Sequence, residues 1–185
     1  MDAAGAAATV QGCRARLTSW ADDKSAARWS MKLRIVALGH RMPAWVGAGF
    51  DDYARRLPRE FALELIELKP APRGRGGSAT RILAVEKERI ATATRGCVVI
   101  ALDEHGQSWT TPEFAARVRA WSRDGRPVAF VLGSADGLAA AVKHDADVIM
   151  ALSALTLPHG LARVVLVEQI YRAASLLQGH PYHRE

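Results

Sequence analysis

The sequence predicts an α/β fold with a parallel sheet. From residue 31 onward, strand-like and helix-like segments alternate, which is the order expected of strands joined by crossover helices. Two of the segments, residues 97–103 and 127–132, are continuously apolar, as parallel strands covered on both faces are. We therefore expect one domain over residues 31–185, an ordinary length for a single domain.

The first half of this domain predicts two strands and two helices. Residues 31–39 read as a strand, and Pro43 stands at the first position of a helix whose apolar residues keep helical spacing as far as residue 57. Residues 61–68 alternate apolar with charged or small side chains and predict the second strand. Residues 79–94 place apolar and charged side chains on opposite sides of a helix.

The second half repeats the alternation. Thr111-Pro112-Glu113 predicts a helix start, because a capping residue, a proline and a first-turn acid follow one another. The remaining elements are strands at 97–103, 127–132 and 147–151 and helices at 138–143 and 161–178. The last helix is apolar on most of its faces, so we expect it to be buried against a partner subunit.

Composition limits the environment and the partners. The net charge of +6 comes from a strongly arginine-rich set, since only five of the 25 basic residues are lysines. This bias fits a phosphate-bearing partner, but it equally fits a GC-rich genome. Cys13 and Cys97 have no metal-ligand spacing and favour a reducing, cytoplasmic setting. No apolar run approaches the roughly 20 residues that span a bilayer, so we expect no membrane association.

Two segments lack the periodicity of a fold. Residues 1–30 are low in complexity and carry no signal peptide, so we expect a disordered extension, either an over-long gene model that should start at Met31 or a short functional arm. Residues 70–78 predict a flexible basic loop, either an RNA-gripping arm or a solvated linker.

Three strands end in candidate ligand loops at residues 102–103, 133–137 and 152–160. Ligands of parallel sheets bind beyond the carboxyl ends of the strands. The loop at 152–160 is unusually apolar, which suggests that its backbone packs inside protein or around a flat ligand such as adenine. The loop at 133–137 has neither the lysine of a P-loop nor the glycine spacing of a dinucleotide fingerprint, and alone it also fits an ordinary tight turn.

Four segments resemble the bacterial RlmH family of SPOUT-class methyltransferases. They are Leu132-Gly-Ser-Ala-Asp-Gly137, Leu152-Ser-Ala-Leu-Thr-Leu-Pro-His159, Arg163 to Ala173, and the terminal His180-Pro-Tyr-His-Arg-Glu185. The resemblance covers residues 31–185, and Ser134 is a departure because many members have glycine there.

The resemblance implies a SPOUT fold with a C-terminal trefoil knot, a homodimer and S-adenosylmethionine as methyl donor, without a metal. It implies N3-methylation of a pseudouridine in helix 69 of 23S rRNA, on the large subunit or the 70S ribosome. The donor-binding residues that it implies are Leu102, Gly133, Leu152, Ser153, Ala154, Leu155, Thr156 and Leu157.

The imide N3–H is a weak acid, so its removal needs a base or a nearby positive charge. Arg172, His159 and Glu168 are the catalytic candidates, with Arg172 preferred for charge stabilisation. Alternatively, His159 donates to backbone at the start of a helix, and Glu168 simply pairs with Arg172 four residues on. Tyr182, His183 and Arg184 suit stacking and phosphate contacts with RNA.

Two other functions stay open at this point. One is a dimeric RNA-binding or ribosome-assembly factor without methyl transfer, against which the intact glycines of the 133–137 loop and the 152–157 run argue. The other is a SPOUT methyltransferase that acts on tRNA, which the lack of an added RNA-binding domain makes a poorer fit.

Overall fold

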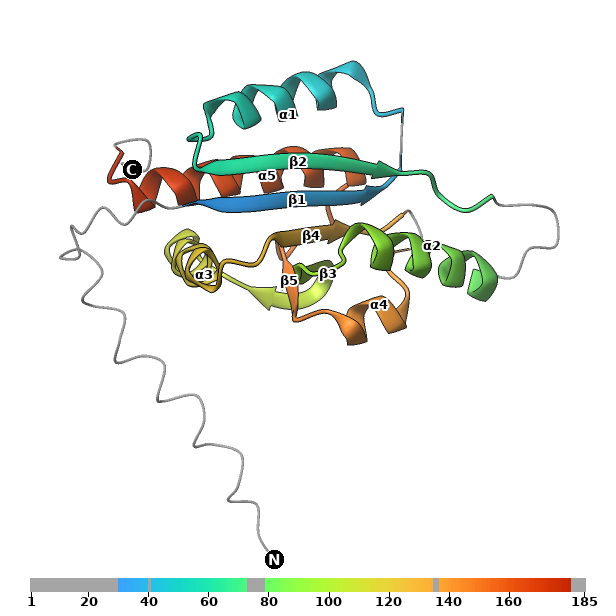
Figure 1. The fold of residues 1–185 in the computed structure, drawn as a ribbon. Coiled ribbons are helices and arrows are strands. Elements are labelled where there is room, and N and C mark those ends of the chain that lie inside the picture. The colour runs from blue at the N-terminus through green and yellow to red at the C-terminus, as the bar shows by residue number, and fades with distance from the viewer. Residues whose placement is uncertain (1–29, 40, 73–78, 135–136, 181–185) are drawn as a thin grey trace, which may run out of the picture.

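A computed structural model describes residues 30–39, 41–72, 79–134 and 137–180. Strands and helices alternate throughout this part of the chain (Figure 1). The strands are β1 (Met31–Leu38), β2 (Phe61–Leu68), β3 (Val98–Ser108), β4 (Val128–Leu132) and β5 (Val148–Ala151). The helices are α1 (Ala44–Arg56), α2 (Ala79–Ala93), α3 (Thr111–Asp124), α4 (Ala140–Asp145) and α5 (His159–Leu177).

The five strands form one sheet in the order β2-β1-β4-β3-β5, and all four strand pairs are parallel. The predicted α/β class with a parallel sheet is therefore confirmed. The C-terminal trefoil knot stays a prediction.

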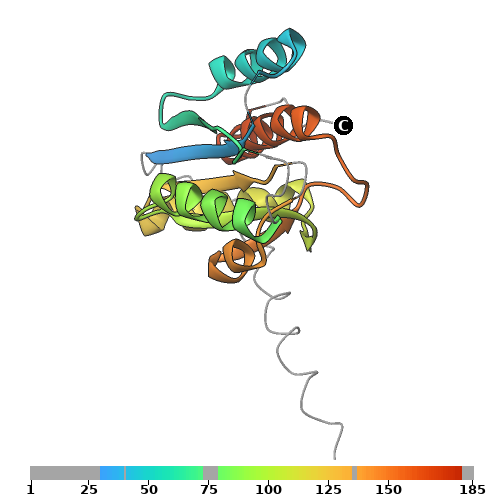
Figure 2. The ribbon, with the colours of Figure 1, turned by 90° about the vertical axis from the view of Figure 1, so that its right-hand side faces the viewer.

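Helices cover both faces of the sheet (Figures 1 and 2). Side chains of β1 alternate between the two cores: Leu33 and Ile35 pack with α1, α3 and α5, whereas Val36 packs with α2 and α4. All three of these side chains are at most 1% exposed. Burial of each such aliphatic side chain contributes about 1.5–3 kcal/mol to the free energy of unfolding. The central strands are therefore a stable part of the fold, from which the loops extend.

The helix ends differ in detail from the sequence expectations. Pro43 is the N-cap of α1 rather than its first residue. Helix α3 is capped by Thr110, one residue earlier than the Thr111 expected, because only Thr110 has Glu113 at the third helical position to complete a reciprocal capping box. Helix α5 ends at Leu177, and Gly179 stops it as expected, because its positive φ allows the amide of His180 to reach the Ser175 carbonyl.

The chain itself covers part of α5. This helix packs on the sheet with α1 and α3 beside it, and its buried residues include Leu166 and Ile170. A Cβ at Gly160 would lie 2.9 Å from Val46, so this glycine allows close approach of α1. We expected a partner subunit to bury α5. Part of this burial comes instead from α1 and α3 of the same chain.

Strand β3 continues beyond the expected residue 103. Leu102 and Gln107 both pair with Met150 of β5, so residues 103–106 bulge out of the ladder. Gly106 permits this, because a Cβ there would lie 2.6 Å from the Met150 backbone. The bulge carries three polar side chains to the carboxyl edge of the sheet.

Within the described residues, no helix is both long and apolar enough to cross a membrane.

Candidate methyl-donor site

A cavity of about 720 Å³ lies at the carboxyl ends of β3, β4 and β5. Its volume is in the range of roughly 300–1,000 Å³ that small-molecule sites occupy. The three loops predicted from the sequence all line it, since each follows one of these strands. The parallel order of the sheet brings these loops together although they are far apart in sequence.

The predicted donor-binding residues gather around this cavity, with one exception. Those that line it are Leu102, Gly133, Leu152, Ser153, Leu155, Thr156 and Leu157. Ala154 does not line it, although it belongs to the same loop. The Ser153 hydroxyl accepts a hydrogen bond from the Leu155 amide at 2.9 Å, which turns the loop locally.

The apolar loop is a surface feature in the isolated chain. Leu155 is 75% exposed, and Ala154 and Thr156 are exposed as well. Of the two expectations, burial inside the chain is wrong for residues 154–156, whereas Leu152 packs against the core of the same chain. An exposed leucine at a cavity mouth leaves apolar surface for a ligand or a second molecule.

Gly133 lets its own loop fold back on itself. A Cβ at this position would lie 2.5 Å from the Gly137 carbonyl carbon and 2.8 Å from the Leu138 amide nitrogen. Gly137 adopts φ +78° and donates its amide to the Ser134 carbonyl at 2.9 Å, which makes a tight turn. The two glycines therefore serve a turn and a close backbone approach, and through these they shape the cavity wall.

Ser134, the departure from the family pattern, has a partner of its own. Its hydroxyl lies 3.4 Å from Oε2 of Glu86, a carboxylate on α2 that is only 2% exposed. The other oxygen of Glu86 accepts the Ala71 amide at 3.1 Å. The serine thereby links the cavity loop to a buried carboxylate.

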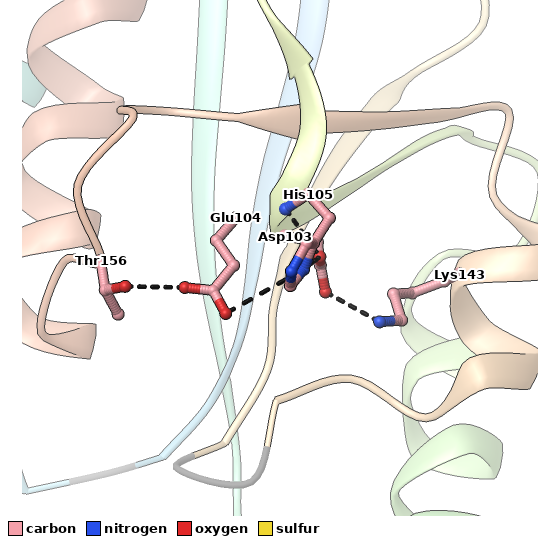
Figure 3. A network of polar contacts seen from close by, with 5 residues as sticks. All are labelled: Asp103, Glu104, His105, Lys143 and Thr156. Carbon is pink, nitrogen blue, oxygen red and sulfur yellow. Dashed lines mark hydrogen bonds and ion pairs between the residues drawn. The ribbon is translucent and has the colours of Figure 1, made fainter.

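A polar network forms one rim of the cavity (Figure 3). Thr156 donates to Glu104 at 2.7 Å, which joins the 152–157 loop to the β3 bulge. Lys143 of α4 donates to Asp103 at 2.9 Å, and His105 contacts the other oxygen of Asp103. Burial alone raises the pKa of Asp103, but the hydrogen bonds from Lys143 and His105 outweigh it and hold that pKa below its usual value. The rim thus offers fixed carboxylates beside apolar walls.

Sequence reasoning missed most of this rim. Asp103 was expected in a candidate ligand loop, but Glu104, His105 and Lys143 were not expected at the site. The signal for Glu104 and His105 was weak but present: polar residues followed by Gly106 directly after an apolar strand. Lys143 gave no signal, because its position depends on how α4 packs.

His159 sits where α5 begins, on the wall of the cavity. Its Nε2 accepts a hydrogen bond from Nε–H of Arg163 at 3.0 Å. Burial and the charge of Arg163 lower the pKa of His159, and a hydrogen bond to the Gly133 backbone only partly offsets them. The imidazole is therefore neutral near pH 7, with one ring nitrogen left as a donor for the Gly133 backbone.

Glu168 and Arg172 do not line this cavity. They pair with each other, with Arg172 Nε 2.9 Å from Glu168 Oε1. Glu168 also accepts a hydrogen bond from Gln169. Arg172 lies about 20 Å further along α5 than His159, at the helical rise of about 1.5 Å per residue. The three catalytic candidates are thus not brought together within one chain.

Tyr182, His183 and Arg184 lie outside the described residues, as does most of the basic loop at 70–78. Among the described residues, no group of three or more His, Cys, Asp or Glu side chains is arranged to hold a metal ion.

Comparison with known proteins identifies the family. The fold and the cavity at the carboxyl edge of the sheet define an α/β protein with a small-molecule site. A family model described as "Predicted SPOUT methyltransferase" matches residues 31–183. The chain belongs to this family, and its reaction class is methyl transfer.

Curated relatives carry a more specific name. Proteins from Burkholderia mallei (strain SAVP1) and Burkholderia pseudomallei (strain K96243) are each 52% identical over 155 residues, which is 83% of this chain and 99% of the relative. Both are named "Ribosomal RNA large subunit methyltransferase H".

Solved structures support the fold alone. A probable methyltransferase from Bordetella pertussis Tohama I is 19% identical with a TM-score of 0.51, over 78% of this chain and 96% of that chain. A probable methylase family protein from Haemophilus influenzae Rd KW20 is 15% identical with a TM-score of 0.54, over 84% of this chain and 71% of that chain.

Proposed function

We propose that this protein transfers a methyl group from S-adenosylmethionine to N3 of a pseudouridine in helix 69 of bacterial 23S rRNA. The observation that carries the proposal is the 52% identity, over nearly the whole length of the relatives, to large-subunit rRNA methyltransferases. The substrate is the large subunit or the 70S ribosome, so the protein acts in the cytoplasm.

The cavity suits the donor. The side chains of Leu102, Leu155 and Leu157 give apolar surface for the adenine ring. Backbone N–H and C=O groups of the same loops can form hydrogen bonds with the edge of that ring. Asp103, Glu104 and Lys143 give charged and polar groups for the hydroxyl, ammonium and carboxylate groups of the rest of the molecule. When bound, the donor supplies an electrophilic methyl group on sulfur, and no metal is required.

The N3 proton is the harder part of the reaction. His159 is a poor base in this arrangement, because its Nε2 lone pair is occupied by Arg163. Arg172 is the preferred group for stabilising the N3 anion, and Glu168 orients its guanidinium. The N3 proton leaves to solvent water, so the protein's own contribution is positioning and charge stabilisation.

Arg172 reaches a donor cavity only if a second chain is present. The separation of about 20 Å along α5 keeps it away from the cavity of its own chain. An antiparallel arrangement of two α5 helices brings the Arg172 of each chain towards the other chain's cavity, as a two-fold homodimer allows. The exposed Leu155 at the cavity mouth adds apolar surface for such a contact.

The C-terminal residues complete the site in this proposal. The cap at Gly179 ends α5, and Pro181 prevents the helix from resuming. Tyr182 then stacks on RNA, while His183 and Arg184 contact phosphate or a base edge.

The direct test is the rRNA of a strain without the gene. Mass spectrometry of helix 69 should show the loss of one methyl group from the N3-methylated pseudouridine, and purified protein with S-adenosylmethionine should restore it on ribosomes. Methylation that persists without the gene would contradict the proposal. Methylation of tRNA instead would support the tRNA alternative, and absence of donor binding in a titration would support the RNA-binding factor.

A further inference from the structure

Arg163 is the largest side chain that is almost completely buried among the described residues. It is 2% exposed, and its residue lies on α5 one turn after His159. A buried guanidinium is costly unless its donors are all satisfied. Its neighbours therefore indicate what the residue is for.

The guanidinium donates to three elements at once. Its Nε–H donates to His159 on α5 at 3.0 Å, and one terminal nitrogen donates to the Gly39 carbonyl, just after β1, at 2.7 Å. The other terminal nitrogen pairs with Glu67 of β2 at 2.5 Å. Arg163 thus ties the start of α5 to the carboxyl ends of β1 and β2.

The contact with Arg163 fixes the protonation of His159. Since an arginine Nε–H can only donate, the histidine Nε2 must carry a lone pair. With Nε2 accepting, the proton of the neutral ring is on Nδ1, and the Gly133 backbone of the cavity loop is the ring's other hydrogen-bond partner. Both ring nitrogens are then occupied, one on Arg163 and one on the cavity loop.

We propose that Arg163 is a positioning residue of the methyl-donor site, which acts through the Nδ1–H tautomer of His159 to hold the Gly133 loop. The inference rests on the proposed donor function of the cavity. It assigns His159 a positioning role in place of the general-base role, because the ring has no free lone pair to accept the N3 proton. It also explains a buried arginine that does not itself line the cavity.

Gly39 is part of the same arrangement. It has φ +139°, a conformation open to glycine. A Cβ there would lie 3.4 Å from His159 Nε2 and 3.5 Å from Arg163. The β1 end therefore leaves room for both side chains to meet.

The first test compares three substitutions of His159. Asparagine places an N–H where Nδ1 stands, glutamine places an acceptor where Nε2 stands, and leucine offers neither. We expect His159→Asn to keep the dissociation constant for S-adenosylmethionine within about threefold, and His159→Leu to raise it by about tenfold, the effect of one lost hydrogen bond that leaves a polar partner unsatisfied. Turnover at saturating donor should follow the same order, with His159→Gln in between.

The second test reads the tautomer without any activity. The ¹⁵N shifts of the His159 ring should report Nδ1–H in the native protein, and the Arg163→Lys variant should show a mixture of tautomers together with weaker donor binding. Arg126→Lys is the control, because Arg126 forms an exposed pair with Asp124 away from the cavity. If Arg163→Lys does not fold, Glu67→Gln loosens the same guanidinium and should shift the ring signals in the same direction.

Two results would overturn the inference. One is a His159→Asn variant that binds donor normally but loses turnover by about 100-fold, as removal of a general base would cause. The other is an Nε2–H tautomer in the native protein. Absence of donor binding in the native protein would count against the proposed function instead, while the ring tautomer would still be measurable.

Discussion

Single residues shape the cavity mainly through backbone space and hydrogen bonds. The family resemblance implies that Gly133 binds the donor. The geometry gives a separate reason for a glycine here, since an added Cβ would meet the backbone of Gly137 and Leu138 before any ligand. A glycine at the end of a buried strand is visible in a sequence, whereas the atoms that face it are not.

Substitution of Gly133 should therefore disturb the loop itself. We expect Gly133→Ala to weaken donor binding by about tenfold or more, because the backbone of Gly137 and Leu138 must shift to accept the methyl group. Isothermal titration calorimetry with S-adenosylmethionine measures this. The matched control is Gly47→Ala on α1, where a Cβ meets nothing within 4 Å. It should leave donor binding unchanged and raise the free energy of unfolding by about 0.5–1 kcal/mol. Unchanged donor affinity in Gly133→Ala would remove this glycine from the site.

The lowered pKa of His159 predicts an acid effect on stability. In the unfolded chain the ring titrates near its ordinary pKa of about 6.5, and in the fold it titrates below that. The unfolded chain thus binds more protons between the two values, so the contribution of His159 is complete above about pH 6.5 and is lost as pH falls towards the folded pKa.

Chemical denaturation of the native protein and of His159→Asn between pH 7.5 and pH 5 checks this. Other charged groups lie near the ring: Arg163 and Glu67 face it with the Gly133 backbone, and Asp103 and Glu104 line the same cavity. The quantity to follow is therefore the difference in unfolding free energy between the two proteins. The native protein should lose more stability than the variant on acidification. An equal loss in both would refute the assignment of this effect to His159.

At the scale of elements, α5 carries two separate groups of polar side chains. Its first turn holds His159 and Arg163 against the sheet, and its later turns carry Glu168 and Arg172. The i,i+4 spacing made the Glu168–Arg172 pair predictable from sequence, and the contact is present. The distance of this pair from the cavity was not predictable, because it depends on where the helix starts relative to the sheet edge.

Arg172→Ala should separate stability from activity. The pair is partly exposed: the Arg172 side chain is 34% exposed and the Glu168 side chain is 14% exposed. Its loss should cost about 0.5 kcal/mol or less of unfolding free energy. Methyl transfer to ribosomes should fall by about 100-fold or more if the guanidinium stabilises the N3 anion, with donor affinity unchanged. Near-normal transfer would mean that the pair is only structural.

The β3 bulge marks a limit of sequence reasoning at this scale. An apolar strand was expected to end near residue 103, but the strand resumes after Gly106 because β5 offers backbone partners there. Register depends on the neighbouring strand, which no local pattern reveals. The polar rim of the cavity was missed for this reason.

For the whole molecule, alternation and apolar patterning were sufficient for the fold class and for the order of the ten elements. The strand order β2-β1-β4-β3-β5 was not predictable, since it is set by which crossover packs on which face. The meeting of three loops at one edge was predictable, because carboxyl ends of parallel strands share an edge.

Residues 1–30 should be dispensable. A protein that starts at Met31 should keep its melting temperature, donor affinity and methyl transfer, because residue 31 begins β1 and the family match begins there. Thermal unfolding and a transfer assay of the two versions give the answer. A loss of transfer in the shorter protein would show a functional arm.

The central claim is that each donor cavity is completed by Arg172 of a second chain, and mixed dimers test it most directly. Gly133→Val chains with one tag and Arg172→Ala chains with another are co-purified as heterodimers, and methyl transfer to unmethylated ribosomes is measured. Each parent homodimer should be inactive. The heterodimer should regain about half of the native rate, because one cavity with an intact loop then faces an intact Arg172 across the two-fold axis. A heterodimer that binds donor but stays as inactive as its parents would contradict the account, since Arg172 would then serve the cavity of its own chain.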